Sequence, residues 1–228
     1  MVALVEPQSL GLDALEETAR HDLVRLNYPP ANWVPERTGP DGKRVLDVLV
    51  VGAGMCGQTA GYGLLREGIR NIRVIERNGH GHEGPWNTTA RMPILRSPKH
   101  LTGPDLGVPS LTFRAWYEAQ HGCDGWEKLY KIDRLDWLRY LLWVRKIVGL
   151  QVENGVGLQK VDPAGDLLKA TLSTGEIVYA RKLVMANGRD GAGGFRWPSF
   201  PSFDPADPKR AGRVFHTLEE IDFGKLVG

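Results

Sequence analysis

The strongest hydrophobic pattern in the chain lies near its first quarter. Residues 45–51 are apolar and mostly β-branched, interrupted only by Asp47, and residues 72–75 form a second short apolar run. Runs of this length predict buried β-strands. Between them, residues 58–67 have the composition of a helix, with Tyr62 and Leu65 available for packing. The order strand, helix, strand predicts a parallel α/β core.

The remaining periodic segments predict a helical extension before this core and further elements after it. Apolar residues recur at helical spacing over residues 10–26, with Ser9 as N-cap, and Pro-rich residues 28–42 follow. Two later helices are expected, one from Thr112 that stops at Gly122 and one over residues 133–148. Short runs separated by turn residues predict an antiparallel meander, and one further strand follows it. The expected strands cover residues 150–153, 156–161, 167–173, 176–179 and 182–185.

A glycine cluster joins the first strand to the first helix. Gly52, Gly54 and Gly57 have the spacing G-x-G-x-x-G. In this arrangement the first glycine permits a tight turn, the second lets the backbone approach a pyrophosphate, and the third lets the helix lie close to the strand. The N–H groups of the first helical turn, from Met55 to Gln58, would bind the anion. Glu76 ends the second strand, where a carboxylate can bind a ribose hydroxyl and would repel a 2′-phosphate.

Composition limits the classes of function. The chain has 228 residues, 42% hydrophobic and 25% charged, with a formal net charge of +2, which gives no reason to expect binding to nucleic acid or to an anionic membrane. The two cysteines, Cys56 and Cys123, indicate a reducing compartment. No apolar run approaches the ~20 residues that span a bilayer. The start of the chain lacks the features of a signal peptide, so we expect the cytoplasm.

A long polar loop follows Glu76, and its aromatic and basic residues suit a segment that folds over a large, flat, anionic ligand. These residues are Trp86, Arg91, Arg96 and Lys99. His80 and His82 lie in the same loop without a third ligand at suitable spacing, so no metal site is expected. A later glycine cluster, residues 191–194, precedes Pro198, which excludes the helix that a second nucleotide site requires.

These motifs together resemble the FAD domain of the class B flavoprotein monooxygenases over residues 44–228. In that family an A-T-G turn and a G-x-W element lie at the flavin, and the corresponding residues here are Ala186-Asn187-Gly188 and Gly84-Pro85-Trp86. Gly212 and His216 resemble part of the family's linker signature, although Arg210 replaces its leading Phe. The resemblance and the fingerprint together give these expected cofactor-binding residues: Gly52, Ala53, Gly54, Met55, Cys56, Gly57, Glu76, Arg77, Trp86, Arg91, Ala186, Asn187 and Gly188.

The resemblance implies a fold class and a domain plan. The fold class is α/β: a Rossmann-like FAD-binding domain with a parallel sheet, helices and an antiparallel β-meander, preceded by a helical extension. The plan places the N-terminal helix and linker at residues 1–43, the FAD-binding domain at 44–200, and a connector toward an NADPH domain at 201–228. The family's second glycine fingerprint is not in this sequence, and a second chain could supply that NADPH domain.

The resemblance also implies a reaction. In the family, NADPH reduces the flavin, the reduced flavin forms a C4a-hydroperoxide with O₂, and this species oxygenates a small organic substrate. No catalytic side chain is assigned. The alternative is a non-catalytic FAD-binding fragment or module. Disulfide reductases share the fold but need a close cysteine pair, which Cys56 and Cys123 do not form in the sequence. Amine oxidases and aromatic hydroxylases fit the Trp86 loop less well.

Overall fold

The computed structural model describes residues 11–189 and, beyond them, residues 191, 193, 196–198, 204, 206–207, 213–219 and 221–226. In this part of the chain, six strands form one sheet in the order β3-β2-β1-β6-β5-β4. Strand β1 pairs in parallel with β2 and β6, and β2 pairs in parallel with β3. Strands β4, β5 and β6 are antiparallel. The bounds are β1 (Leu46–Val51), β2 (Ile72–Glu76), β3 (Glu153–Asn154), β4 (Leu158–Ala164), β5 (Leu167–Leu172) and β6 (Ile177–Met185).

Alternation along β1 explains why both faces of the sheet are covered. Val48 and Val50 join the larger hydrophobic cluster, which contains the helices, whereas Leu49 and Val51 join a second cluster with the meander. Successive side chains of a strand point to opposite faces. The continuous apolar run of β1 is therefore a consequence of its position in the centre of the sheet.

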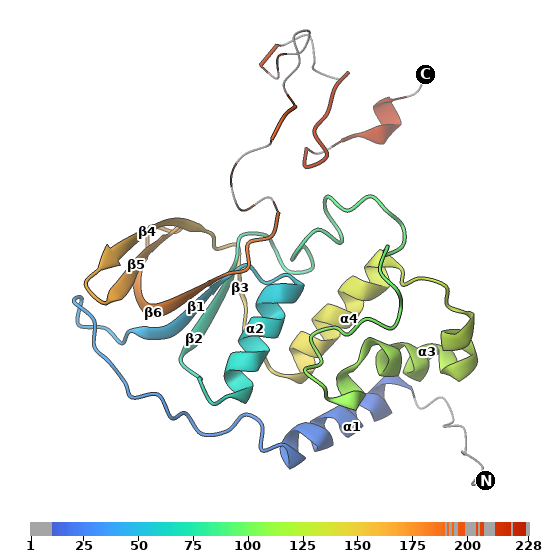
Figure 1. The fold of residues 1–228 in the computed structure, drawn as a ribbon, viewed down its shortest axis with the longest axis horizontal. Coiled ribbons are helices and arrows are strands. Elements are labelled where there is room, and N and C mark those ends of the chain that lie inside the picture. The colour runs from blue at the N-terminus through green and yellow to red at the C-terminus, as the bar shows by residue number, and fades with distance from the viewer. Residues whose placement is uncertain are drawn as a thin grey trace.

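The helices lie mainly on one side of the molecule, with α2 between them and the sheet (Figure 1). Helix α4 is the most buried of the described helices, and the Asp133 side chain caps it by accepting hydrogen bonds from the N–H groups of Leu135 and Asp136. Ala19 and Leu23 of α1 are buried in the same cluster as α4, so the N-terminal helix packs on the core. The bounds are α1 (Leu12–Arg25), α2 (Met55–Arg66), α3 (Phe113–Lys128) and α4 (Arg134–Ile147), with short 3₁₀ turns at η1 (Pro109–Leu111) and η3 (Phe223–Lys225).

The Rossmann-like α/β prediction is confirmed, with corrections to four local predictions. Residues 150–152, expected in a strand, do not pair with another strand, because Leu150 packs against α2 at Gly61. Of the expected strand 150–153, only Glu153 is in a strand, β3, which pairs in parallel with β2. The separate strands expected at 176–179 and 182–185 are one strand, β6. The first helical segment of α3 does stop at Gly122, which has a non-helical φ of 70°, but a second segment that was not expected follows at once and extends to Lys128. Leu26, expected on the packed face of the first helix, is 50% exposed. Ser9 lies outside the described residues.

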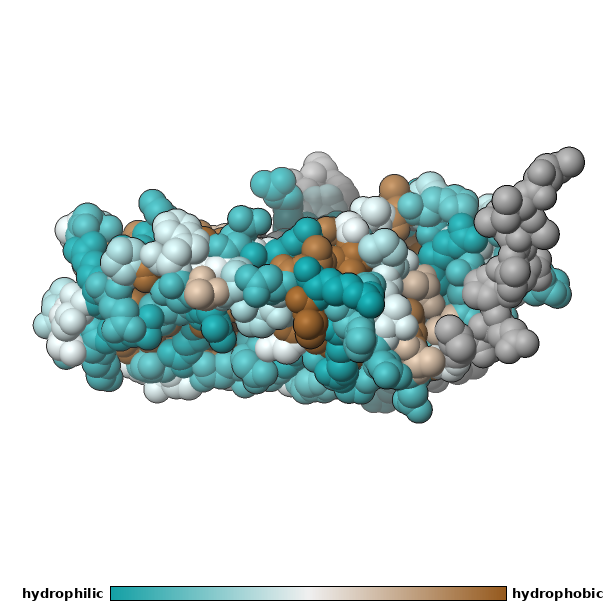
Figure 2. All heavy atoms as spheres, turned by 90° about the horizontal axis from the view of Figure 1, so that it is seen from below, coloured by the Kyte–Doolittle hydropathy of each residue, from teal (hydrophilic) through white to brown (hydrophobic). Residues whose placement is uncertain are grey.

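The described surface has no single large apolar area in the view of Figure 2, where hydrophilic side chains cover most of the face and the hydrophobic patches are small and separate. Among the described residues, no helix has the length and apolar composition needed to cross a bilayer.

Candidate functional site

The turn after β1 and the turn after β6 meet at the carboxyl end of the sheet. The N–H of Ala186 donates to the carbonyl of Val51 at 2.8 Å. A Cβ added to Gly52, which has a φ of +95°, would lie 2.4 Å from the Ala186 carbonyl oxygen, and one on Gly57 would lie 1.8 Å from the Gly52 oxygen. The first and third glycines of the fingerprint are thus required by the packing of the chain itself.

Gly54 is different, because a Cβ there would meet little of the protein. Its nearest neighbour would be the Cα of Gly84, at 3.4 Å, which is an ordinary contact. Gly84, with a φ of +70°, starts the Gly84-Pro85-Trp86 turn, and a Cβ there would lie 3.4 Å from Trp86 Nε1. The fold therefore places the second glycine of the fingerprint beside the predicted G-P-W element, although 30 positions separate them in the sequence.

Helix α2 begins at this point without a side-chain cap. Gly54 is the N-cap residue and supplies no side-chain hydrogen bond to the first turn. The first N–H groups of a helix have no intrahelical acceptor, and the helix dipole makes this end favourable for an anion. Met55 is half-buried and Cys56 is exposed here. A helix N-terminus without a side-chain cap, next to a glycine where no Cβ blocks the approach, is the binding site that a dinucleotide pyrophosphate requires.

Glu76 holds the glycine loop through its backbone. Its Oε2 accepts a hydrogen bond from the N–H of Ala53 at 2.9 Å, and its Oε1 accepts one from the N–H of Asn78 at 3.0 Å. Gln58 Nε2 donates to the carbonyl of Ala53 at 3.0 Å. The backbone N–H and the backbone carbonyl of Ala53 are therefore both hydrogen-bonded. The sequence analysis did not assign this role to Gln58, although a glutamine on the buried face of α2 was a usable signal.

Trp86 lies half-buried next to α4. Its ring is edge-on to Trp137, with centroids 6.3 Å apart, and Arg134 donates a hydrogen bond to the Trp86 carbonyl. The Trp86 Nε1 atom is buried and has no hydrogen-bond partner among the described residues. Buried indole N–H groups usually have an acceptor. The Nε1 atoms of Trp116, Trp137 and Trp143 are also buried without a partner among the described residues, and the free donor of Trp86 differs from them by its place next to Gly84.

Asn187 and Gly188 continue the second turn of the site. Asn187 Nδ2 donates to the carbonyl of Gly191 at 2.7 Å, and Gly188 adopts a φ of +67°. The side-chain amide therefore stabilises the turn after β6, on which the carbonyl of Ala186 lies against Gly52. The fold brings the glycine loop, Glu76, Trp86 and the A-N-G turn together.

The basic residues of the loop are placed differently. Arg91 donates to the carbonyls of Thr217 at 2.6 Å and Glu219 at 2.8 Å, and its guanidinium lies 5.6 Å from the centroid of the Phe223 ring. Lys99 donates to the Trp126 carbonyl at 2.6 Å and so lies against α3. Arg77 is exposed beside Gly157, and Arg96 is also exposed. The expected contacts of Arg77 and Arg91 with a cofactor stay predictions.

A buried acid before the G-P-W turn was missed by the sequence analysis. The side chain of Glu83 has no solvent exposure and accepts hydrogen bonds from Arg145 Nη1 at 2.6 Å and Asn154 Nδ2 at 2.9 Å. Burial by itself raises the pKa of Glu83. The hydrogen bonds from Asn154, from the backbone N–H groups of Glu83 and Gly81, and from Arg145 outweigh burial, so the pKa lies below its usual value. Nothing in the local sequence distinguishes Glu83 from a solvated loop acid.

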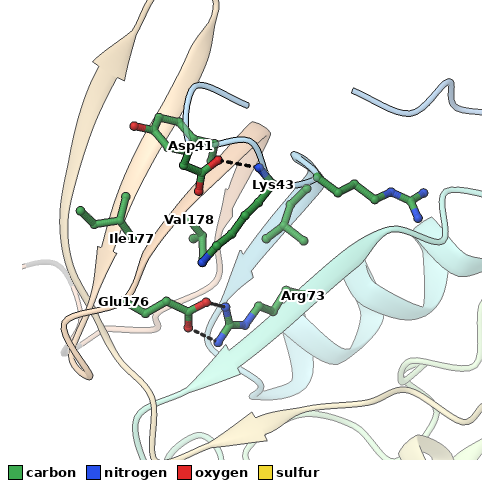
Figure 3. Close-up of a pocket in the computed structure, with 9 residues that line it drawn as sticks. Asp41, Lys43, Arg73, Glu176, Ile177 and Val178 are labelled. Carbon is green, nitrogen blue, oxygen red and sulfur yellow. Dashed lines mark hydrogen bonds and ion pairs between the residues drawn. The ribbon is translucent and has the colours of Figure 1, made fainter. Parts of the chain in front are cut away.

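A shallow cavity of about 150 Å³ lies at the opposite, amino end of the strands (Figure 3). Its lining includes Lys43 and Arg73, and Arg73 is paired with Glu153 at 2.7 Å and Glu176 at 2.8 Å. These carboxylates raise the pKa of the Arg73 guanidinium, so its charge is satisfied within the protein. In the described part of the chain, no group of three or more His, Cys, Asp or Glu residues is arranged to hold a metal ion.

Comparison with known proteins decides the family. The family described as FAD-NAD(P)-binding matches residues 49–190, which contain the glycine loop, Glu76, Trp86 and the A-N-G turn. The chain belongs to this FAD-NAD(P)-binding family. The segment that matches begins inside β1 and ends just after the turn that follows β6. The match therefore covers all three segments that meet at the carboxyl end of the sheet.

Two curated relatives of this FAD-NAD(P)-binding protein share 43% identity with it. The FAD-dependent urate hydroxylase of Xanthomonas campestris pv. campestris matches over 221 residues, which are 96% of this chain and 46% of the relative. The sarcosine oxidase subunit beta of Rhizobium meliloti matches over 75 residues, 32% of this chain and 17% of the relative. The chain thus spans less than half the length of either relative.

One solved structure with a similar fold is the ornithine N-hydroxylase of Kutzneria sp. 744. It has 17% sequence identity and a TM-score of 0.52, and the alignment covers 62% of this chain and 37% of that one. At this identity the likeness shows the fold alone.

Proposed function

We propose that this chain binds FAD at the carboxyl end of β1 and forms part of an NADPH-dependent flavoprotein monooxygenase. The observation that carries the proposal is the uncapped N-terminus of α2 beside Gly54, where the backbone is open to a ligand and Trp86 supplies a buried free donor. The family to which the chain belongs supports it. The proposed cofactor-binding residues are Gly52, Ala53, Gly54, Met55, Cys56, Gly57, Glu76, Arg77, Trp86, Arg91, Ala186, Asn187 and Gly188.

Each group of residues has a proposed role. The N–H groups of the first turn of α2 bind the pyrophosphate, and the dipole of α2 adds on the order of 0.3–2 kcal/mol to anion binding. Glu76 and Gln58 hold the Ala53 peptide, so the loop does not have to reorganise when the ligand arrives. We propose that the Glu76 carboxylate also accepts a hydrogen bond from the adenosine ribose. Trp86 and Trp137 provide an apolar wall that excludes water from the bound flavin.

FAD supplies the redox chemistry when bound: it takes a hydride from NADPH and uses O₂ to oxygenate a small organic molecule, with water as the second product. The Xanthomonas relative is named a urate hydroxylase, so urate is the first substrate to test. We propose that NADPH binds outside the part of the chain described above, on this polypeptide or on a second chain. Cys56 and Cys123 are free thiols, which supports the cytoplasm as the proposed compartment.

An absorbance spectrum of the purified chain, with and without added FAD, tests the cofactor. We expect the flavin bands to co-purify with the protein or to be retained after gel filtration. A Gly54→Ala variant should fold normally, because the added Cβ makes only an ordinary 3.4 Å contact with Gly84, yet it should lose roughly 10-fold or more in FAD affinity because the Cβ occupies the place of the pyrophosphate.

The variant separates binding from folding. Equal retention of FAD by the Gly54→Ala variant and the wild type would place the cofactor elsewhere and overturn the site. Addition of NADPH under air, with urate present and absent, then tests the reaction. Bleaching of the flavin, with O₂ consumption that rises when urate is present, supports the monooxygenase. Flavin that stays oxidised in this chain supports the alternative of an FAD-binding module.

A further inference from the structure

The acid before the G-P-W turn links three segments that are far apart in the sequence. Glu83 Oε1 accepts from Arg145 Nη1 of α4 at 2.6 Å and from Asn154 Nδ2 of β3 at 2.9 Å, and Glu83 Oε2 accepts from the N–H of Gly81 at 2.7 Å. Arg145 Nη2 also lies 3.3 Å from Asn154 Oδ1. The Arg145 side chain is only 12% exposed and that of Glu83 is fully buried. Both carboxylate oxygens of Glu83 and both Nη atoms of Arg145 have hydrogen-bond partners, as a buried ion pair requires.

The same face of α4 holds the other end of the turn. Trp137 follows Arg134 by three positions, and Arg145 follows it by eleven. This spacing places the three residues on one side of a helix with 3.6 residues per turn. Arg134 donates to the Trp86 carbonyl and Trp137 packs edge-on to the Trp86 ring. Helix α4 therefore fixes the four-residue segment from Glu83 to Trp86 at its first and last residues.

The segment from Glu83 to Trp86 forms one wall of the proposed FAD site. Gly84 lies between the two fixed residues, and its Cα is the nearest atom to the place that a Cβ of Gly54 would occupy. A shift of the segment away from α4 would move Gly84 and the free Trp86 Nε1 relative to the glycine loop. Loss of about 1 Å of precision in a supporting contact is enough to weaken a bound ligand.

We propose that Glu83 and Arg145 are positioning residues for FAD: their buried ion pair fixes the Gly84-Pro85-Trp86 turn against the glycine loop and thereby sets how long the chain retains the cofactor. This inference rests on the proposed function. The two side chains are hydrogen-bonded to each other and to Gly81, Val152 and Asn154, none of which belongs to the glycine loop. Their effect is exerted through Gly84 and Trp86.

The test measures the release of FAD from the wild-type chain, from Glu83→Gln and from Arg145→Lys. Both variants nearly preserve side-chain size. Glu83→Gln removes the negative charge of the pair. Arg145→Lys keeps the positive charge but removes the Nη2 group that donates to Asn154. The matched control is Arg181→Gln, which breaks a partly buried pair with Asp47 near the amino end of β1, away from Glu83 and its partners. Flavin fluorescence after dilution gives the release rate, thermal unfolding of each apo chain gives its stability, and visible circular dichroism reports the surroundings of the bound flavin.

We expect both variants to release FAD roughly 10-fold faster than the wild type and to change the visible circular dichroism, whereas Arg181→Gln should lower the melting temperature without either effect. Release at the wild-type rate from Glu83→Gln and Arg145→Lys would overturn the inference while leaving the proposed function intact. Equal acceleration by Arg181→Gln would also overturn it, because the effect would then follow stability alone. A wild-type chain that binds no FAD would overturn the proposed function and this inference with it.

Discussion

At the scale of single residues, two glycines of α2 differ in what surrounds them: Gly57 belongs to the fingerprint and Gly61 does not. Gly57 and Gly61 are both buried and let α2 lie close to the sheet. A Cβ on Gly57 would meet backbone, the Gly52 oxygen at 1.8 Å, whereas one on Gly61 would meet the ends of the Leu150 side chain at 2.8 and 3.1 Å. A side-chain end can move at small cost, and a backbone carbonyl in a tight turn cannot.

This difference predicts a ranking of stabilities. Gly57→Ala should lower the free energy of unfolding by about 3 kcal/mol or more, because the turn must open to admit the methyl group, and Gly61→Ala should cost about 1 kcal/mol or less. Urea unfolding of the apo chain, followed by tryptophan fluorescence, measures both values. Equal losses in the two variants would contradict the packing of α2 on the β1 turn.

At the scale of elements, the loop after β2 is anchored by α4 and by β3 through Glu83. Burial opposes ionisation of this acid, but the hydrogen bonds from Asn154, the backbone N–H groups and Arg145 hold its pKa below the usual value of 4.5. A folded-state pKa below the unfolded value means that the acid stabilises the fold fully above the unfolded pKa. That stability is lost as the pH falls through the folded pKa.

The wild type should therefore lose more stability than Glu83→Gln when the pH falls from about 6 to about 3, because only the wild type has this acid to protonate. Urea unfolding at a series of pH values gives the two curves. Other acids with lowered pKa values, such as Glu16 and Glu176, are present in both proteins and cancel in the difference. Parallel curves would show that folding does not lower the pKa of Glu83.

At the scale of the whole molecule, one arginine connects the loop after β2 with the described segment near the C-terminus. Arg91 donates to the carbonyls of Thr217 and Glu219 and lies over the ring of Phe223. Figure 1 shows the described C-terminal residues beyond the carboxyl end of the sheet, on the side where the loop also rises. Arg91 thus ties the segment expected to act as a connector to the loop that contains Trp86.

Arg91→Ala should free this segment without changing the core. We expect limited proteolysis to cut residues 213–226 several-fold faster in the variant, because two charge-assisted hydrogen bonds and a cation–π contact are lost. The melting temperature should stay within about 2 °C of the wild type, since the contacts removed lie outside the core. Arg96→Ala, in the same exposed loop, is the matched control. An unchanged cleavage pattern in Arg91→Ala would contradict the connection.

The sequence alone was sufficient for the features that depend on local chemistry. The apolar runs of β1 and β2, the spacing of Gly52, Gly54 and Gly57, and the acid at Glu76 predicted the Rossmann-like core, because strand propensity and turn geometry are encoded within a few neighbouring residues. The domain boundaries at 43 and 200 stay predictions. The expected meander was correct for β4, β5 and β6 but wrong for residues 150–152, because apolar character does not distinguish a paired strand from a buried loop.

Only the tertiary structure decided what lies beside the glycine loop. The sequence determined that Gly54 lacks a Cβ, that Trp86 follows a glycine and that Ala186-Asn187-Gly188 follows an apolar run. Parallel pairing of β1 with β2 and β6 then brought these segments to one end of the sheet. Glu83 accepts hydrogen bonds from Arg145 and Asn154, which lie 62 and 71 positions away from it in the chain. Contacts over such separations depend on how helices and strands pack, which no local pattern of residues specifies.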